Sequence, residues 1–360
     1  MSVRKKIGEI LKNYDPANIT IGTICSHSSL QIFHGAKKEG FRTLGISLKK
    51  KPRYFDGFPL AKPDDFLVLE DHADIFNHTE ELIEKNVILV PHGSFVEYLG
   101  PENFLKLEVP SFGNKEVIPW ESNRKKEREW LESAGISMPK EFKDPKDIDI
   151  PVLVKYHGAK GGRGFFIAKD YEEFLNGIDR SQKEKYTIQE YIVGTRYYIH
   201  YFYSPLVEEG YRLSKGSLQI LSMDRRDESN IDEMYKLGSQ ERLKELGFYP
   251  SFVVTGNVPV VLRESLLEKA FDMGAKVVES SFKLISGGGM IGPFCLETVV
   301  TDKLEFKVFE ISARIVAGTN LFVTSSPYAD YIQQGLSTGR RIAQEIKLAL
   351  KTGRLEEILS

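Results

Sequence analysis

Residues 151–170, PVLVKYHGAKGGRGFFIAKD, place a glycine-rich loop between two short apolar runs. Short runs of β-branched, aromatic and other apolar residues bounded by glycines are typical of strands. A Walker P-loop requires a helix directly after the loop, but Gly164 is followed by the strand-like run FFIA. The segment therefore predicts a strand–loop–strand hairpin and excludes a Walker motif.

The loop has the chemistry of a phosphate-binding segment. Backbone N–H groups of Gly161 and Gly162 can approach phosphates closely because glycine has no Cβ, and Lys160 and Arg163 add cations. Lys155 lies in the preceding run, where a lysine either faces an anion or lies on an edge strand with its stem running to water. The adjacent loop favours the anion, so lysine and hairpin together predict a phosphate site.

The first 120 residues alternate strand-like runs with helical segments, which predicts an open parallel α/β domain. In such sheets ligands bind beyond the carboxyl ends of the strands. The polar segments 26–29 (SHSS) and 91–94 (PHGS) follow strands, and Ser28 is expected to cap the next helix. The expected strands are NITIGTIC, FRTLGISL, DFLVLED and NVILVPHG.

Residues 121–150 contain a charged helix that ends at Gly135, which predicts a connection between domains. The pattern then changes to short strands with few helices between them. Near the C-terminus, the segment 339–353 predicts a closing helix that ends at Gly353.

Two glutamates lie on neighbouring predicted strands, Glu297 in FCLETVV and Glu310 in FKVFEISAR. A four-residue turn over 302–305 would place them directly opposite each other, and a two-residue turn would make them diagonal neighbours. Like charges opposite each other on a sheet cost roughly 0.2–1 kcal/mol. The pair is therefore either on a solvated face or holds a hard cation such as Mg²⁺, which binds one or two carboxylates together with substrate phosphates.

The chain carries 49 Lys and Arg against 51 Asp and Glu, so its charge predicts neither a nucleic-acid nor a membrane partner. No apolar run reaches 18 residues, and the N-terminal segment reads as an amphipathic helix and not as a signal peptide. Cys25 and Cys295 are isolated in apolar runs, which is typical of buried thiols in a reducing cytosol.

The order of these motifs resembles the ATP-grasp superfamily: a strand lysine, a glycine hairpin, a carboxylate on one strand and E-x-S-x-R on the next. From about Ile19 to the last helix, the chain also resembles the archaeal 5-formaminoimidazole-4-carboxamide ribonucleotide (FAICAR) synthetase family, PurP. The segments that carry this likeness are SHSSLQIFHGAKKEGF, VPHGSF, KYHGAKGGRGFFIA, EYIVGTRYYIHYFYSPL, DRRDESNID, VTGNVPVVLRESLL, GMIGPFCLE and FEISAR.

The resemblance implies an α/β and α+β fold with four parts. These are an N-terminal substrate-binding domain (1–120), a connecting helix and linker (121–150), a small ATP-grasp lobe (151–204) and a large lobe (205–360). It also implies a cytoplasmic, homo-oligomeric ATP-dependent ligase that uses Mg²⁺ or Mn²⁺. This ligase would convert AICAR and formate to FAICAR, with release of ADP and phosphate through formyl phosphate, in IMP biosynthesis.

Site residues follow from the same motifs. Arg314 would stabilise the transferring phosphoryl group. His27, Ser94 and Asn257 would bind AICAR, although a lone histidine is otherwise a core residue and a lone asparagine a turn residue. The metal would be held by Glu297 and Glu310. The residues expected to bind ATP are Lys155, Gly161, Gly162, Glu190, Tyr191, Val193 and Glu228.

Two departures from the family pattern leave alternatives open. Ser312 stands where the superfamily has an asparagine metal ligand, and Val316–Ala317 replace a polar, glycine-rich segment. The alternatives are an ATP-grasp ligase for another small carboxylate and amine, or a nucleotide-binding paralogue without catalysis. Retention of Lys155, Arg314 and the glutamate pair counts against the second, because a non-catalytic protein has no need of a metal pair.

Overall fold

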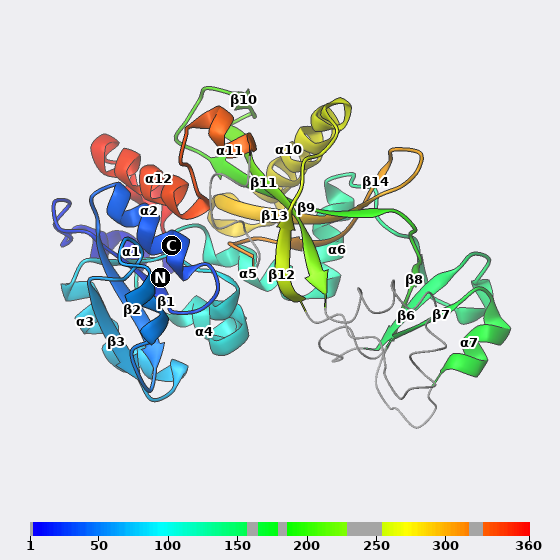
Figure 1. The fold of residues 1–360 in the computed structure, drawn as a ribbon, viewed down its shortest axis with the longest axis horizontal. Helices are drawn as coiled ribbons and strands as arrows, with labels where there is room; N and C mark the ends of the chain where they lie inside the picture. The colour runs from blue at the N-terminus through cyan, green and yellow to red at the C-terminus, as the bar shows by residue number, and fades with distance from the viewer. Residues whose placement is uncertain (1–2, 157–164, 179–185, 229–253, 317–326) are drawn as a thin grey trace.

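The computed structural model describes residues 3–156, 165–178, 186–228, 254–316 and 327–360. Three sheets organise this part of the chain, one in the N-terminal domain and two in the part that follows (Figure 1). The predicted fold class, an open parallel α/β domain followed by two lobes with antiparallel sheets, is confirmed.

The N-terminal domain is built on a four-stranded parallel sheet in the order β3-β2-β1-β4. The central strand β1 is buried along its whole length, as expected of a parallel strand covered on both faces. The strands are β1 (Thr20–Ile24), β2 (Arg42–Leu48), β3 (Asp65–Leu69) and β4 (Val87–Leu89), and the helices are α1 (Val3–Leu11), α2 (Ser29–Lys38), α3 (Thr79–Glu84) and α4 (Pro101–Lys106).

The end of the chain returns to this domain, where α12 (Thr338–Thr352) packs across α2 and α13 (Leu355–Ile358) contacts α1 (Figure 1). Glycines allow α2 and α12 to approach closely. A Cβ on Gly35 would lie 2.3 Å from the Arg340 backbone N, and one on Gly339 would lie 2.4 Å from the Gln31 carbonyl oxygen. The predicted C-terminal helix therefore joins the large lobe to the N-terminal domain.

Two helices, α5 (Ile118–Glu121) and α6 (Arg124–Ser133), lie where a single charged helix was predicted from the sequence. α6 packs on α10 (Leu267–Leu284), where the Trp130 indole donates a 3.0 Å hydrogen bond to the Val277 carbonyl oxygen. Gly135 follows α6 with a φ of +65°, a conformation that favours glycine at a helix end.

The small lobe contains a four-stranded antiparallel sheet in the order β5-β8-β6-β7. The predicted strand–loop–strand hairpin is present as β6 and β7, which pair from Val152 with Ala168 to Lys155 with Phe165. The elements are β5 (Glu141–Phe142), β6 (Val152–Tyr156), β7 (Phe165–Ala168), β8 (Tyr186–Glu190) and α7 (Tyr171–Gly177).

The large lobe contains a six-stranded antiparallel sheet in the order β10-β11-β9-β13-β14, with β12 also paired to β11. β9 pairs here, although its residues were assigned to the small lobe from the sequence, so we propose a lobe boundary at 191–194. The elements are β9 (Thr195–Ser204), β10 (Tyr211–Arg212), β11 (Ser217–Glu228), β12 (Val254–Pro259), β13 (Gly292–Val300), β14 (Phe306–Ser312) and α11 (Pro327–Ile332).

The two faces of this sheet differ in character. One face packs on α10, and its buried residues include Ile199, Tyr201 and Leu296. Tyr201 donates a 2.7 Å hydrogen bond to the Ala270 carbonyl oxygen of α10. The other face carries polar residues beside apolar ones such as Phe202, and its polar residues His200 and Glu297 belong to the candidate site.

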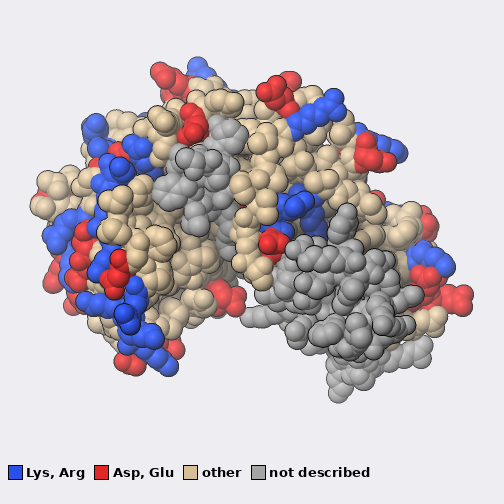
Figure 2. Space-filling view, in the orientation of Figure 1, with Lys and Arg blue, Asp and Glu red and all other residues tan. Residues whose placement is uncertain are grey.

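Among the described residues, no helix is long and apolar enough to cross a bilayer. Cys25 and Cys295 are free thiols, the first partly buried and the second fully buried. In the space-filling view, Lys and Arg side chains are interspersed with Asp and Glu over the N-terminal domain (Figure 2), in keeping with the near-zero net charge.

Candidate active site

The two polar segments of the N-terminal domain meet at the carboxyl edge of its sheet, because β1 and β4 are neighbours. The imidazole rings of His27 and His92 lie 4.7 Å apart, centroid to centroid, in a T-shaped arrangement. A Cβ on Gly93 would lie 3.0 Å from His27 Nε2, so glycine permits this approach. The structure thus brings His27 next to the segment that contains Ser94.

Ser28 has a different role from the one predicted. It occupies the N-cap position of α2, but its backbone is left-handed, with φ of +69°, and its side chain does not cap the helix. Its Oγ lies 3.0 Å from His27 Nδ1. The Ser28 hydroxyl faces His27 because the backbone turns sharply between β1 and α2.

His92 is a structural histidine. It is fully buried, its Nε2 donates a 3.0 Å hydrogen bond to the Ile24 carbonyl oxygen, and its Nδ1 accepts one of 3.3 Å from the Ser94 N–H. Burial lowers the pKa of His92 to about 3, so the ring is neutral. It therefore fixes the backbone at Ser94, which is itself buried.

His27 is only partly buried, and burial together with the Arg314 charge lowers its pKa to about 4. A neutral imidazole offers one donor and one acceptor and carries no charge. His27 can therefore form hydrogen bonds to a ligand, whereas the cation near this edge of the sheet is Arg314.

Arg314 joins the N-terminal segment to the large lobe. Its guanidinium carbon would lie 3.8 Å from a Cβ on Gly93, and its Nε lies 3.3 Å from Glu121 Oε1. Its Nη1 is buried and has no hydrogen-bond partner within the part of the chain that the structure describes. A buried, unpartnered guanidinium nitrogen favours an anionic ligand at this position.

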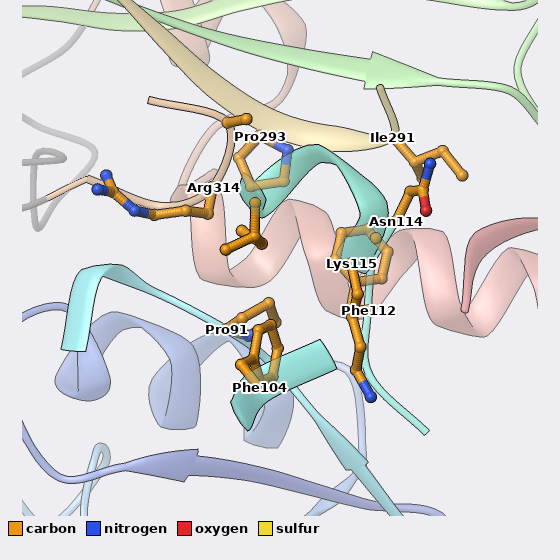
Figure 3. A pocket seen from close by; sticks show the side chains of 11 residues that line it. Pro91, Phe104, Phe112, Asn114, Lys115, Ile291, Pro293 and Arg314 are labelled. Atoms are coloured by element: carbon orange, nitrogen blue, oxygen red, sulfur yellow. The ribbon is translucent and has the colours of Figure 1, made fainter. Parts of the chain in front are cut away.

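A small cavity beside Arg314 does not serve as the substrate site. It is about 20 Å³ in volume, enough for about one water molecule. Figure 3 shows Arg314 running away from the other labelled side chains that line the cavity, including Asn114 and Lys115. The guanidinium group therefore points away from this cavity.

Glu297 and Glu310 lie directly opposite each other on β13 and β14. This is the arrangement expected from the four-residue turn over 302–305. The turn itself is different, because Val300 pairs with Phe306 and leaves an odd number of residues between them. A β-bulge next to this pair adds a residue to β14 and restores the opposition. Bulges are common beside active sites, where they redirect a side chain.

The two glutamates have different surroundings. Glu310 is exposed, whereas Glu297 is buried and its Oε1 accepts a 2.8 Å hydrogen bond from Arg226 Nη2. Burial and the Glu310 charge raise the pKa of Glu297 to about 8. Arg226 also lies over the Tyr198 ring, 3.9 Å from its centroid, so its planar group is held in place.

The charged connecting helices contribute two carboxylates that the sequence did not single out. Glu121 is buried and accepts a hydrogen bond from the Ala313 N–H, while Glu127 accepts one of 2.7 Å from the Ile311 N–H. Burial and the Glu310 charge raise the pKa of Glu127 to about 9. These contacts tie α5 and α6 to the strand end that carries Glu310 and Arg314. No sequence signal separates Glu121 and Glu127 from their exposed acidic neighbours.

Lys155 lies on β6, which is paired on both sides, so the alternative of an edge-strand lysine is wrong. Burial lowers its pKa, with Arg124 acting in the same direction and Glu310 in the opposite one. Lys155 is therefore within electrostatic range of Glu310 across the lobes. Gly161 and Gly162 lie outside the described residues.

The other expected ATP ligands lie at the end of β8, in the segment between the lobes and at the end of β11. The side chains of Tyr191 and Val193 are 41% and 77% exposed, which leaves them available to a ligand. The Glu190 carboxylate accepts a 3.0 Å hydrogen bond from the Lys140 N–H, so that side chain has a structural partner. Glu228 is the last residue of β11 and pairs with Val254.

Asn257 lies on β12 opposite Arg226, and its Nδ2 donates a 2.6 Å hydrogen bond to Asp224 Oδ2. Asp224 is fully buried and also contacts His200. Asn257 is therefore part of a regular strand pair and not a turn residue. His200, Asp224 and Arg226 were not identified from the sequence.

In the described ranges, no group of three or more His, Cys, Asp or Glu side chains could hold a metal ion. The Glu297–Glu310 pair still fits a cation that takes its other ligands from phosphates and water. Ser312 is buried opposite Cys295, and Val316 packs with Cys295 and Tyr198. Ala317 lies outside the described residues.

Two family models match the chain. One is described as "Protein of unknown function (DUF1246)" and covers residues 21–142, and the other, "Domain of unknown function (DUF1297)", covers residues 169–360. The chain is 64% identical, over the whole length of both proteins, to 5-formaminoimidazole-4-carboxamide-1-(beta)-D-ribofuranosyl 5'-monophosphate synthetase of Methanococcoides burtonii.

Solved structures agree with this relationship. An IMP biosynthesis protein PurP from Thermococcus kodakaraensis is 30% identical with a TM-score of 0.72, over 94% of this chain and all of that one. N5-carboxyaminoimidazole synthetase from Staphylococcus aureus, complexed with ADP, shares the fold with a TM-score of 0.57 at 16% identity, over 89% of this chain and 77% of that one.

Proposed function

The chain belongs to the FAICAR synthetase family, and we propose that the site between its three sheets carries out the family reaction with the residues described above. The protein is an ATP-dependent ligase that formylates AICAR in purine biosynthesis. The observation that carries the site assignment is Arg314. Its Nη1 is buried and has no hydrogen-bond partner among the described residues. Its guanidinium carbon would lie 3.8 Å from a Cβ on Gly93 and its charge lowers the pKa of Glu297, so an anionic reactant near both would complete its hydrogen bonds.

The AICAR site would be formed by His27, Ser94 and Asn257. His27 and the Ser94 backbone lie at the carboxyl edge of a parallel sheet, the usual ligand position in such domains. A neutral His27 can form hydrogen bonds to a hydroxyl or phosphate oxygen of a sugar phosphate. Asn257 comes from β12 of the large lobe, so the substrate would bridge the N-terminal domain and that lobe.

ATP would lie between the small and large sheets. Lys155 supplies a cation for the phosphates from a central strand, and the exposed Tyr191 and Val193 lie in the segment between the lobes. Gly161 and Gly162 would close over the phosphates and Glu228 would bind from the end of β11. Mg²⁺ or Mn²⁺, held by Glu297 and Glu310, would neutralise phosphate charge and orient the γ-phosphoryl group.

In the proposed reaction an oxygen of formate attacks the γ-phosphorus of ATP, and ADP leaves, giving formyl phosphate. The 5-amino nitrogen of AICAR then attacks the formyl carbon, phosphate leaves, and the nitrogen loses a proton. Arg314 would hold the transferring phosphoryl group, and Lys155 the phosphates of ATP. Positioning and charge neutralisation are sufficient for phosphoryl transfer, and no covalent side-chain nucleophile is required.

We also propose that the protein works as a homo-oligomer in the cytoplasm. The two free thiols suit a reducing compartment. Sedimentation analysis at micromolar concentration checks the assembly.

The deciding experiment measures ADP release from Mg²⁺-ATP and AICAR, with and without formate, and follows FAICAR by chromatography. ADP and FAICAR that appear together only with formate support the proposal. ADP released only with another carboxylate or amine keeps the ligase chemistry but changes the substrate. No ADP with any combination contradicts the catalytic assignment.

A further inference from the structure

A polar network of three side chains, His200, Asp224 and Asn257, crosses three strands of the large sheet. His200 on β9 contacts Asp224 Oδ1 on β11 through its Nε2, and Asn257 on β12 donates from Nδ2 to Asp224 Oδ2 at 2.6 Å. Asp224 is 0% exposed and His200 is 4% exposed. Both Asp224 oxygens are thus engaged, one by the imidazole and one by the amide.

This polar network determines which end of the Asn257 amide faces the site. A carboxylate only accepts hydrogen bonds, so the NH₂ end of the amide must face Asp224. The carbonyl Oδ1 is then directed away from Asp224, on the partly exposed side of β12. Without a fixed acceptor behind it, the amide could rotate by about 180° and present a donor in place of an acceptor.

The polar network lies close to the residues proposed to hold the reacting groups. Asn257 is opposite Arg226, and Arg226 bonds to Glu297. Asp224 is opposite Tyr198, which in turn is opposite Glu297 on the next strand. The exposed end of Asn257 therefore lies on the same face of the sheet as the carboxylates that would hold the metal.

We infer that Asp224, held by His200, is a positioning residue that fixes Asn257 Oδ1 as the acceptor for an N–H of the AICAR 5-amino group. This inference rests on the proposed function. An amine attached to an imidazole ring has two N–H donors and a lone pair that must point at the formyl carbon. An acceptor at Asn257 holds one N–H and directs the lone pair, whereas a rotated amide would set donor against donor.

The first test compares AICAR with its analogue that lacks the 5-amino group, by calorimetric titration of the full-length protein. In the wild type, loss of the amine is expected to weaken binding about tenfold, the equivalent of one well-placed hydrogen bond. In Asp224→Asn, AICAR and its analogue should bind equally. Asp227→Asn, an exposed aspartate on the same strand, should behave as the wild type.

The second test uses a rescue. In Asp224→Asn the new amide would receive the His200 hydrogen bond on its oxygen and turn its NH₂ to residue 257, so Asn257 would rotate. In Asp224→Asn/Asn257→Asp, the carboxylate at 257 accepts from the new amide and keeps a second oxygen for the amine. The double variant should recover AICAR affinity and at least tenfold in kcat/KM for AICAR, with the KM for ATP unchanged throughout.

The outcomes separate the inference from the proposed function. Wild-type protein that neither binds AICAR nor releases ADP with it overturns the proposed function and the inference together. An active wild type whose Asp224→Asn variant still distinguishes AICAR from the analogue overturns the inference alone. A double variant that recovers thermal stability but not AICAR affinity also overturns the inference alone, because the polar network would then only hold the strands together.

Discussion

The Arg226 guanidinium donates a 2.8 Å hydrogen bond to the buried carboxylate of Glu297 while Glu310 lies directly opposite on the next strand. Two carboxylates opposite each other on a sheet repel. Burial and the Glu310 charge raise the pKa of Glu297, and Arg226 offsets part of this effect. The exposed Glu310 has the freedom to turn to a cation, whereas Glu297 is fixed. This asymmetry leads to the first prediction.

Glu310→Gln is expected to lower kcat by at least about 10²-fold, the usual effect of removing one electrostatic contact to a reacting group. Because Glu310 is exposed and its charge opposes ionisation of Glu297 and Glu127, its removal should not lower the free energy of unfolding. Steady-state kinetics and urea unfolding measure the two quantities. Glu305→Gln, an exposed glutamate in the same hairpin, is the control. Equal activity of the two variants would contradict the metal assignment.

Lys155→Met is expected to abolish turnover while the fold survives, because the phosphates of ATP lose a cation that is held in a central strand. Calorimetry should show weakened binding of an ATP analogue and unchanged binding of AICAR. Lys169→Met, which removes an exposed lysine paired with Glu173, controls for loss of charge in the same lobe. Unchanged ATP binding in Lys155→Met would show that the hairpin lysine has no part in the site.

Glu127 should make stability depend on pH. Its pKa rises from 4.5 to about 9 on folding, so between these values the folded state binds a proton that the unfolded state lacks. Stability therefore falls as pH rises through this window. In Glu127→Gln, the ligand-free protein should lose less thermal stability between pH 5 and pH 9 than the wild type.

Thermal unfolding of the metal-free protein at several pH values measures this difference. The amide oxygen introduced by Glu127→Gln can still accept the Ile311 N–H hydrogen bond, so loss of that bond does not complicate the comparison. The exposed Glu129→Gln on the same helix should follow the wild-type curve. Parallel curves for Glu127→Gln and the wild type would argue against a protonated buried glutamate.

Gly339→Ala is expected to destabilise the protein by about 1–3 kcal/mol, because the new Cβ would lie 2.4 Å from the Gln31 carbonyl oxygen where α12 crosses α2. Urea unfolding gives the change. Gly57→Ala, where a Cβ meets nothing within 4 Å, is the matched control. A stable Gly339→Ala variant would mean that α12 can move away from α2 without cost.

Local patterns were sufficient to predict several parts of the fold. The alternation of apolar runs and helices gave the parallel sheet of the N-terminal domain, because burial on both faces produces continuous apolar strands. The glycine loop followed by FFIA gave the β6–β7 hairpin, since a strand and not a helix follows it. The spacing of Glu297 and Glu310 gave two possible registers and could not choose between them.

The sequence by itself therefore determined the fold class and the family, because these depend on short-range periodicity and on motifs. Only the tertiary structure decided the rest. The bulge that sets Glu297 against Glu310, the pairing of β9 with the large sheet, and the burial of Glu121 and Glu127 all depend on contacts between distant segments. The acceptor behind Asn257 is likewise 33 residues away in the chain, on another strand. No local pattern encodes such partners, because a side chain's charge, pKa and orientation are set by whatever the fold places beside it.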